Sequence, residues 1–513
     1  MKKILALLFF SILIIPNNAK SQSNFRKTLG GSFSDAIIEN SGDSTFYVGY
    51  DSPGFFTSTA DIRITKLNFA GDTLWSKFYG SAVNYQYATK ISSMKLTENN
   101  GLIISGTVGI NPTKIYVLRI DSAGNKLWSK NYEFSSSFEY ELVYSEQLSD
   151  HGFIVSGVAW NGVSVYLSFV FKLSSNGNIL FNRVFKFPFD NTYVRKVSET
   201  KNNNLLLMGL VTNLINSNTV HGNPFLLELS QTGNFLWNKF YGDSTVINDG
   251  LDFQVVDSTI YLLGIEDPEN TISTYLLKAD SSGNILWTKT YYGFFGHSMT
   301  LNWDSTFLIA AGGLNAQTVT PILSRTNLFG DTISTTDYGV PDGGWGNNVI
   351  MTPDSGVILM TFGPYLIKTN ISGVTGCNEP IVISIDTMIP ASFSQTIQFI
   401  NLTLNTSNEF NITGRGSIQI TDYSNWCPTV PVTEFNNPDE LEIFPNPTTG
   451  KLTIGNSQSP VNKIELFNLL GEKVPAAVDC KLRTVDCSFL PPGIYILQAS
   501  GEGKVWRGKV VKE

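Results

Sequence analysis

Apolar and polar residues alternate along most of the chain in short runs that are separated by glycine-containing turns. An apolar run that contains a glycine, such as GLIISGT at 101–107, is followed by an alternating run such as KIYVLRI at 114–120. A turn of the DSAGN type then leads into a third run, LWSKNYE at 127–133. Alternation with a period of two predicts half-buried β-strands, and Gly or Asn in the turns predicts hairpins.

The turn and the strand that follows it recur along the chain. The phrase reads GDTLWSK at 71–77, GNKLWSK at 124–130, GNILFNR at 177–183, GNFLWNK at 233–239 and GNILWTK at 283–289, with a degenerate copy, GDTISTT, at 330–336. A period of about 50 residues indicates one supersecondary unit per repeat. Since each period holds four apolar slots, we predict four strands per unit.

The two ends of this array complement each other. The segment FRKTLG at 25–30 matches WSKFYG at 75–80 but lacks a preceding hairpin partner, whereas no Trp strand follows the turn at Gly373. An N-terminal strand that completes the last unit would close a ring and leave no exposed sheet edge. We therefore predict an all-β chain with a seven-bladed β-propeller at 25–376, followed by a β-rich connecting segment at 377–436.

The N-terminus has the pattern of an export signal. Lys2 and Lys3 precede an apolar run at 4–15, and the small residues near position 21 predict a signal peptide at 1–21. The apolar run is short for a membrane span, so no transmembrane segment is expected. The formal net charge of −8 also argues against nucleic acid as a partner. We expect the mature protein to be soluble and to lie outside the cytoplasm.

The composition changes from about Glu434, where a module with short alternating strands begins. FPNPTTGKLTI at 444–454, IELFNLLGEKV at 464–474, LPPGIYILQ at 490–498 and GKVVK at 508–512 resemble the type A C-terminal sorting domain of the bacterial type IX secretion system. The resemblance implies a β-sandwich-like sorting domain at 437–513, with the type IX machinery and a sortase-like peptidase as partners. The residues that match the family's pattern are Pro445, Asn446, Pro447, Gly450, Gly493, Tyr495, Lys509, Val510, Val511 and Lys512.

All four cysteines lie at or beyond the end of the predicted propeller. The simplest pairing in an oxidising compartment is Cys377 with Cys427 and Cys480 with Cys487, one of the three that four cysteines allow. Buried free thiols are the alternative. Cys480 and Cys487 are not part of the sorting-domain pattern. A zinc site is not expected, because no CxxC spacing occurs and the three histidines (His151, His221 and His297) fall in different repeat units.

The repeat itself carries a second resemblance. RIDSAGNKLW at 119–128 and KADSSGNILW at 278–287 resemble quinoprotein-type propeller repeats, in which an Asp, a Gly and a Trp lock neighbouring blades, although Gly124 falls one residue early. We expect the aromatic residues to pack between sheets and the Asp to stabilise the turn. No cofactor is expected. The aromatic slot is occupied by Trp75, Trp128, Phe181, Trp237 and Trp287.

The sequence has no recognised catalytic motif of the HExxH, GxSxG or phosphate-binding-loop type. The acidic stretches NDGLD at 248–252 and EDPEN at 266–270 could supply oxygen ligands to Ca²⁺ or be solvated turns. Several aromatic residues of predicted loops could stack on sugars or pack the loops over the blade ends: Phe55, Phe56, Tyr292, Phe294, Phe295 and Trp345.

These observations favour a non-enzymatic binding or adhesion protein for a glycan or a protein. Two alternatives are a secreted hydrolase that acts on polysaccharide through loop carboxylates, and a structural cell-surface component. Fold alone does not decide among them. The convergence of acidic side chains from several units on one mouth of the central channel would favour the hydrolase.

Overall fold

The computed structural model describes the chain from residue 25 to residue 512 with gaps. The described residues are 25–28, 33–40, 42–51, 62–80, 89–109, 113–135, 137–162, 166–216, 219–242, 247–267, 272–315, 318–339, 344–362, 365–370, 372–375, 392–393, 397–400, 403, 405–407, 411–415, 421–422, 442–455, 461–468, 473–501 and 504–512. The predicted signal peptide at 1–21 lies outside them, as do Cys377, Cys427, Phe55 and Phe56. The chain divides into two compact units, Met1–Trp426 and Cys427–Glu513.

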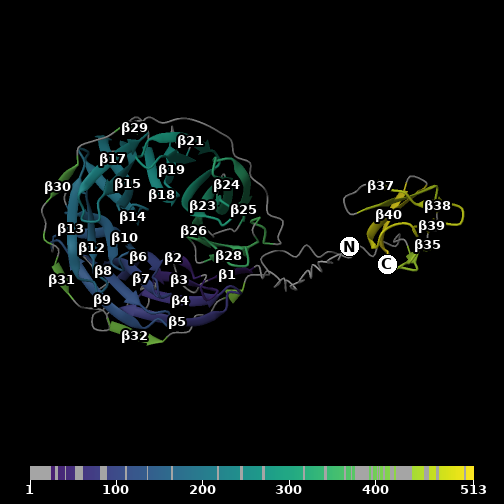
Figure 1. Ribbon diagram of the computed structural model, residues 1–513, viewed down its shortest axis with the longest axis horizontal. Helices are drawn as coiled ribbons and strands as arrows, with labels where there is room; N and C mark the ends of the chain where they lie inside the picture. The colour runs from purple at the N-terminus through teal and green to yellow at the C-terminus, as the bar shows by residue number, and fades with distance from the viewer. Residues whose placement is uncertain are drawn as a thin grey trace, which may run out of the picture. The chain divides into compact units, whose positions relative to one another are not determined.

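Every regular element of the described residues is a β-strand, and most strands of the first unit form antiparallel groups of four, two of which are joined by one parallel bridge between Gly222 and Ile247. In chain order these groups are β2 (Phe33–Asn40), β3 (Thr45–Asp51), β4 (Ile62–Asn68) and β5 (Thr73–Gly80); β6 (Thr89–Leu96), β7 (Leu102–Val108), β8 (Lys114–Ile120) and β9 (Lys126–Glu133); β10 (Glu139–Gln147), β11 (Phe153–Trp160), β12 (Tyr166–Leu173) and β13 (Ile179–Lys186); β14 (Asn191–Glu199), β15 (Leu205–Asn216), β16 (Thr219–Leu229) and β17 (Phe235–Tyr241); β18 (Ile247–Val256), β19 (Thr259–Asp267), β20 (Ser273–Ala279) and β21 (Ile285–Tyr291); and β22 (Phe294–Leu301), β23 (Thr306–Asn315), β24 (Thr318–Asn327) and β25 (Thr332–Asp337). The groups lie around a ring, with β2, β6, β10, β14, β18 and β26 nearest to its centre (Figure 1). This arrangement is propeller-like.

The N-terminal strand completes the last group. That group contains β26 (Gly346–Met351), β27 (Val357–Thr361) and β28 (Tyr365–Thr369), and β1 (Phe25–Thr28) pairs antiparallel with β28. The register places Phe25 opposite Lys368 and Thr28 opposite Tyr365. One sheet therefore joins residues that lie at opposite ends of the array in sequence.

The connecting segment follows the outer edge of the ring (Figure 1). Its short strands add to one group after another in reverse chain order: β29 (Ser392–Phe393) to β17, β30 (Gln398–Ile400) to β13, β31 (Asn405–Ser407) to β9, β32 (Asn411–Arg415) to β5, and β33 (Thr421–Asp422) to β1. An outer strand otherwise presents unpaired backbone groups to other chains. The segment covers these edges, a course that the sequence pattern did not predict.

Neighbouring groups pack face to face through buried apolar side chains. One cluster joins Ile64 and Tyr79 of the β2–β5 group with Ile104 and Leu118 of the β6–β9 group. Because the second and third strands of the groups, such as β7, β8, β11 and β12, are buried along almost their whole length, each sheet is buried between two others. The ring therefore consists of a series of interfaces between sheets.

The described residues of the second unit form two four-stranded sheets. The first has the order β34 (Glu442–Phe444), β35 (Lys451–Gly455), β39 (Thr484–Asp486) and β38 (Ala477–Asp479). The second has the order β37 (Lys473–Val474), β36 (Lys463–Phe467), β40 (Gly493–Gly501) and β41 (Lys504–Lys512). Leu452 and Val485 of the first sheet and Leu466, Leu497 and Val510 of the second belong to one buried cluster.

The predicted pair of Cys480 and Cys487 is not formed, and both are free thiols. Cys487 lies in the core of the second unit, where its Sγ donates a hydrogen bond to the carbonyl of Gly450 over 2.8 Å. Burial raises the pKa of the Cys487 thiol. Cys480 lies in the turn after β38 and is half-buried, so the two side chains occupy different environments.

Candidate functional site

The strands nearest to the ring centre share a β-bulge at an equivalent position. The register shifts between Ser34 and Ala36, Ile91 and Ser93, Glu141 and Tyr144, Val194 and Lys196, Gly250 and Asp252, Gly296 and Ser298, and Gly346 and Asn348. A bulge bends its strand and redirects a side chain, and bulges are frequent beside functional sites. Here they shape the wall of the ring centre.

The glycines in the apolar runs allow these bulges. A Cβ atom on Gly106 would lie 1.8 Å from the carbonyl oxygen of Lys90, and one on Gly209 would lie 2.0 Å from that of Tyr193. Both carbonyls belong to the strand with the bulge, so any larger residue would displace its backbone. An isolated glycine inside a strand is a known sign of a bulge, and this signal could have revealed the bulges from sequence.

The bulged strands surround a cavity of about 240 Å³ at the ring centre. Its wall takes residues from every inner strand, among them Ile38, Ser93, Lys95, Tyr144, Arg195, Lys196, Asp252, Gln254, His297, Ser298 and Asn348. Pockets for drug-sized ligands usually measure roughly 300 to 1,000 Å³. The cavity can therefore enclose one end of a ligand rather than a whole oligomer.

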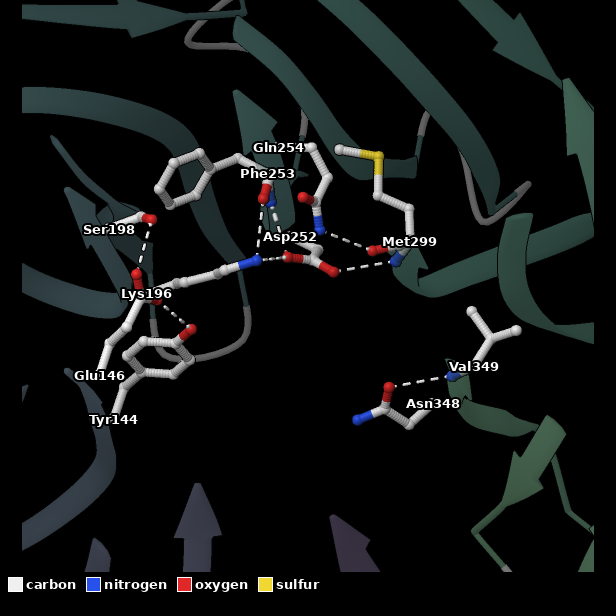
Figure 2. A network of polar contacts seen from close by, with 10 residues as sticks. All are labelled: Tyr144, Glu146, Lys196, Ser198, Asp252, Phe253, Gln254, Met299, Asn348 and Val349. Atoms are coloured by element: carbon white, nitrogen blue, oxygen red, sulfur yellow. Dashed lines mark hydrogen bonds and ion pairs between the residues drawn. The ribbon is translucent and has the colours of Figure 1, made fainter. Parts of the chain in front are cut away.

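A polar network crosses one side of this cavity (Figure 2). The Lys196 ammonium contacts Asp252 Oδ1 at 2.6 Å and donates to the Phe253 carbonyl at 2.8 Å. The other oxygen of Asp252 accepts from the backbone N–H of Met299 at 2.9 Å. Gln254 donates to the Met299 carbonyl at 3.0 Å. Both oxygens of the Asp252 carboxylate are therefore engaged.

A second carboxylate, Glu146, lies near Tyr144 and Ser198, and the Lys196 side chain lies between it and Asp252 in the view of Figure 2. Glu146 accepts one hydrogen bond from the Tyr144 hydroxyl at 3.1 Å and one from the Ser198 hydroxyl at 3.0 Å. Burial raises the pKa of Tyr144 well above its usual range, and the charges of Glu146 and Asp252 act in the same direction. Tyr144 therefore stays protonated and donates to Glu146.

Arg195 and His297 occupy two of the bulges. The guanidinium of Arg195 contacts Asp249 at 2.6 Å, and burial raises the pKa of Asp249 although Arg195 opposes this shift. Burial lowers the pKa of His297 to about 4, and the charge of Arg195 adds to the effect. His297 is therefore neutral at neutral pH.

Aromatic side chains gather in two places at the end of the ring where the second and third strands of each group are joined. Trp345 stacks on Phe362 with centroids 4.4 Å apart and on His297 at 5.3 Å, and Phe295 meets both Trp345 and His297 edge to face. The structure thus brings together Phe295 and Trp345, two of the predicted sugar-stacking residues. Phe294 is fully buried and Tyr292 is exposed.

The second aromatic group belongs to neighbouring sheets. Trp160 stacks on Tyr166 with centroids 5.7 Å apart, and Tyr166 meets Tyr193 at 4.9 Å. All three are half-buried. The sequence gave no sign of this group because its members come from three strands and share no repeat position.

The acidic stretches do not form loops in the described residues. Residues 248–252 belong to β18, where Asp249 and Asp252 contact Arg195 and Lys196. In the other stretch, only Glu266 has a described side chain, and it accepts from Ser273 at 3.3 Å. Across the described part of the chain, no group of three metal-ligating side chains was found.

A second cavity, of about 310 Å³, lies between the β14–β17 and β18–β21 groups beside Trp237. Its charged groups are already paired, since Lys201 contacts Asp257 and the Trp237 indole donates to Glu228. Only two sheets supply its wall. We therefore take the ring-centre cavity as the candidate site.

The aromatic residues of the repeat contact the turn of the following group. A Cβ atom on Gly124 would lie 2.8 Å from the Trp75 ring, and the equivalent contacts join Gly177 with Trp128, Gly233 with Phe181, Gly283 with Trp237 and Gly330 with Trp287. These turn glycines have φ between 73° and 77°. Positive φ and a flat aromatic neighbour together explain why the turn carries glycine.

In the second unit, several predicted sorting residues meet along the last strand. The Asn446 side chain donates to the Lys509 carbonyl and accepts from the Val511 N–H, both at 2.7 Å. Thr448 N–H donates to the Val511 carbonyl at 2.8 Å. The PNPTTG turn thus forms hydrogen bonds with the backbone groups of Lys509 and Val511 at the edge of β41.

The other predicted sorting residues lie near this contact or in the core. Val510 and Lys512 are buried, Gly493 begins β40 opposite Lys512, and the Tyr495 hydroxyl donates to the Pro491 carbonyl at 2.9 Å. Pro445 and Pro447 flank Asn446, and the Gly450 carbonyl accepts a hydrogen bond from the Cys487 thiol. No helix long and apolar enough to cross a membrane occurs in the described residues.

Residues 442–513 match the family model described as "Secretion system C-terminal sorting domain". The chain is therefore exported to the cell surface or the extracellular space. No curated protein matches the sequence.

Solved structures with some similarity include an unknown-function protein from Dyadobacter fermentans DSM 18053, at 13% identity over 54% of this chain and 92% of that chain, with a TM-score of 0.39. The polysaccharide lyase Uly1 is 9% identical over 66% of this chain and 90% of its own, with a TM-score of 0.40. A Synechocystis apocarotenoid oxygenase is 9% identical over 73% and 95%, with a TM-score of 0.39. Likeness at this level supports no statement about what this chain binds or does.

Proposed function

We propose that this exported chain is a seven-bladed β-propeller that binds a glycan or a protein at the face carrying the two aromatic groups, and that it is not an enzyme. Its C-terminal unit is proposed as a β-sandwich-like type IX sorting domain. The groups of four strands, with β1 as the last strand of the last group, support the blade count. We place the boundaries of the parts at 25–376, 377–436 and 437–513.

The contact between Trp345 and His297 carries the binding proposal. Trp345 belongs to the aromatic group at the loop end of the ring, and His297 belongs to the wall of the cavity. Their stacking makes the aromatic surface continuous with the polar cavity. Large flat rings beside a few convergent polar groups are the usual composition of a ligand site.

Binding is favoured over hydrolysis by the state of the channel carboxylates. Asp252 is held by Lys196 and Met299, and Glu146 is held by Tyr144 and Ser198. A general acid or base needs a proton that it can exchange with the substrate. In the described residues, both oxygens of each carboxylate already contact donors of the protein.

The tail supports a role in export rather than in binding. We propose that the machinery reads the last strand together with the turn at Pro445, Asn446 and Pro447. The support is that Asn446 and Thr448 bond to β41 at its backbone. The remaining family residues, Gly450, Gly493, Tyr495, Lys509, Val510, Val511 and Lys512, are proposed to maintain that strand and its core.

The binding proposal is tested by screening the mature protein on an array of glycans and host proteins. Trp345→Ala and Trp160→Ala should each weaken the retained interaction about tenfold, the effect of losing roughly 1.4 kcal/mol. Trp303→Ala is the matched control, because Trp303 is 68% exposed in the hairpin at the opposite end of β22. Equal losses in all three variants, or hydrolysis of a polysaccharide on the array, would contradict the proposal.

A further inference from the structure

The cavity at the ring centre is lined by more cationic than anionic side chains. Three cationic side chains, Lys95, Arg195 and Lys196, line it together with one carboxylate, Asp252. The chain as a whole has a formal net charge of −8. Positive charge gathered at the centre of an acidic protein requires an explanation, because a buried charge is costly unless it is paired.

Two of the three cations have partners. Lys196 contacts Asp252 and Arg195 contacts Asp249, both at 2.6 Å. Lys95 forms no ion pair with a carboxylate of the described residues, and the contact found for it is with the ring of Tyr144, 5.3 Å from its Nζ to the centroid. The charge of Glu146 raises the pKa of Lys95, but this carboxylate already accepts hydrogen bonds from Tyr144 and Ser198. Of the three cations of the cavity wall, Lys95 is therefore the one without an ion pair in the described residues.

Other polar atoms of the same wall lack hydrogen-bond partners. Arg195 Nε, His297 Nε2 and Ser298 Oγ are buried polar atoms without a hydrogen-bond partner in the described residues, and all three residues line the cavity with Lys95. Buried polar groups in proteins are nearly always satisfied. The wall of the cavity therefore holds more polar groups than its own side chains satisfy.

We propose that the ring-centre cavity binds the anionic group of an acidic glycan, a carboxylate or a sulfate, with Lys95 as its ionic anchor. This inference rests on the proposed function and names the chemical class of its ligand. A saccharide suits the site better than an acidic peptide, because the cavity admits only one end of a ligand and its rim carries the stacked rings of Trp345 and Phe362. The anion enters the cavity while the sugar ring lies against the aromatic surface.

The surroundings of Lys95 set the pH dependence of this binding. Protein encloses the amine even though it faces the cavity, and this burial lowers the pKa of Lys95, with Lys196 adding to the effect and with Glu146 and Asp252 opposing it. Tyr144 faces the amine as a protonated phenol. Because the ammonium form attracts the anion, affinity should fall as the pH rises through this lowered pKa.

The test measures binding of four probes to the mature protein by calorimetry: inorganic sulfate, acetate, glucuronate and glucose. Sulfate and glucuronate should bind, acetate should bind more weakly than glucuronate, and added salt should weaken all three. Lys95→Met should reduce the affinity for sulfate and glucuronate about tenfold or more. Lys90→Met is the matched control, since Lys90 is an exposed residue of the same strand, and it should change nothing.

Unchanged anion affinity in Lys95→Met, or failure of the wild-type protein to bind any anion, would overturn the inference. Acetate binding as tight as glucuronate would overturn its saccharide part in favour of an acidic peptide. If Lys95→Met does not fold, reductive methylation of the wild-type protein replaces it: sulfate should protect Lys95 and leave Lys90 reactive, and equal labelling of Lys95 with and without sulfate contradicts the proposal.

The two proposals fail in different ways. A neutral glycan that is retained on the array and unaffected by Lys95→Met removes the anion site but leaves the binding function. Sulfate binding through Lys95, combined with an array that retains nothing, leaves the anion site but removes the proposed function.

Discussion

Arg183 donates a hydrogen bond from Nε to the carbonyl of Gly233 over 3.0 Å, and so occupies a role that tyrosine has elsewhere in the ring. In other groups, a tyrosine of the outer strand donates its hydroxyl to the turn glycine of the next group: Tyr79 to Gly124, Tyr132 to Gly177, Tyr241 to Gly283, Tyr291 to Gly330 and Tyr338 to Gly373. Phe185 stands at that position before Gly233 and has no hydroxyl. The arginine two residues earlier takes over the bond.

This relationship predicts a compensation between two residues. Arg183→Met should destabilise the protein by about 1 to 2 kcal/mol, the usual net value of a hydrogen bond from a charged donor at a partly buried site. Phe185→Tyr restores the hydroxyl and should recover most of that loss in the double variant. Urea titrations of the wild-type protein, both single variants and the double variant measure the coupling. Additive losses would show that the two side chains do not share this acceptor.

The N-terminal strand should be required for the integrity of the ring. Deletion of residues 22–30 removes the partner of β28 and of β33, and so exposes the edge of the last group. We expect a lower melting temperature and association of the protein through the free edge. A chain that begins at Gln22 is the control. Unchanged melting and monomeric elution of the shortened chain in size-exclusion chromatography would contradict closure by β1.

Glu39 should make the stability of the protein depend on pH. Burial raises the pKa of Glu39 to about 7 in the folded protein, whereas an unfolded glutamate titrates near its usual value of about 4.3. The folded state therefore holds more protons between these values, and its stability falls as the pH rises through this range. The effect should be on the order of 1 kcal/mol, because the side chain is only half-buried.

Glu39→Gln should remove this slope. The variant should be more stable than the wild-type protein above pH 7 and should differ little from it below pH 4. Thermal melts at pH 4, 6 and 8 provide the comparison, with Glu141→Gln as a control at an exposed carboxylate. Parallel curves for the wild-type protein and Glu39→Gln would show that Glu39 titrates normally.

How far the sequence predicts this structure depends on whether the signal is local. A turn like that of Asp121 and Gly124, followed by a strand like that of Trp128, recurs along the chain. The sequence therefore predicts the groups of four strands and the unpaired strand at Phe25. The bulges have a local trace too, in the glycines of the apolar runs, Gly106 and Gly209.

Other features had no such trace. The course of the connecting segment around the ring depends on pairing with strands hundreds of residues away, and its strands are too short to show a period. Lys95, Glu146, Lys196 and Asp252 come from four successive groups, one from each, and only the packing of these groups around the ring brings them together. The stretch at 248–252 was expected as an acidic loop, although its carboxylates serve as partners of two cations.

The last strand should decide export. Truncation after residue 436 should leave a folded first unit that stays in the periplasm, and removal of the five residues GKVVK should also block export. Asn446→Ala frees the backbone of Lys509 and Val511 and should reduce export, whereas Asn468→Ala, which alters another asparagine of the second unit, should not. Fractionation of cells in a host with type IX secretion measures each form. Export of the tail-less form would contradict the assignment.

The most direct test of the account is hydrogen–deuterium exchange of the mature protein with and without a ligand retained from the array. The account predicts slower exchange at residues 294–300 and 345–350, where β22 and β26 meet the cavity and the Trp345 stack. Exchange at the hairpin around Trp303, at the opposite end of the same strand, should not change. Protection confined to that hairpin, or spread over the outer strands while 294–300 exchanges freely, would contradict the claim that the ring centre and its aromatic face form the binding site.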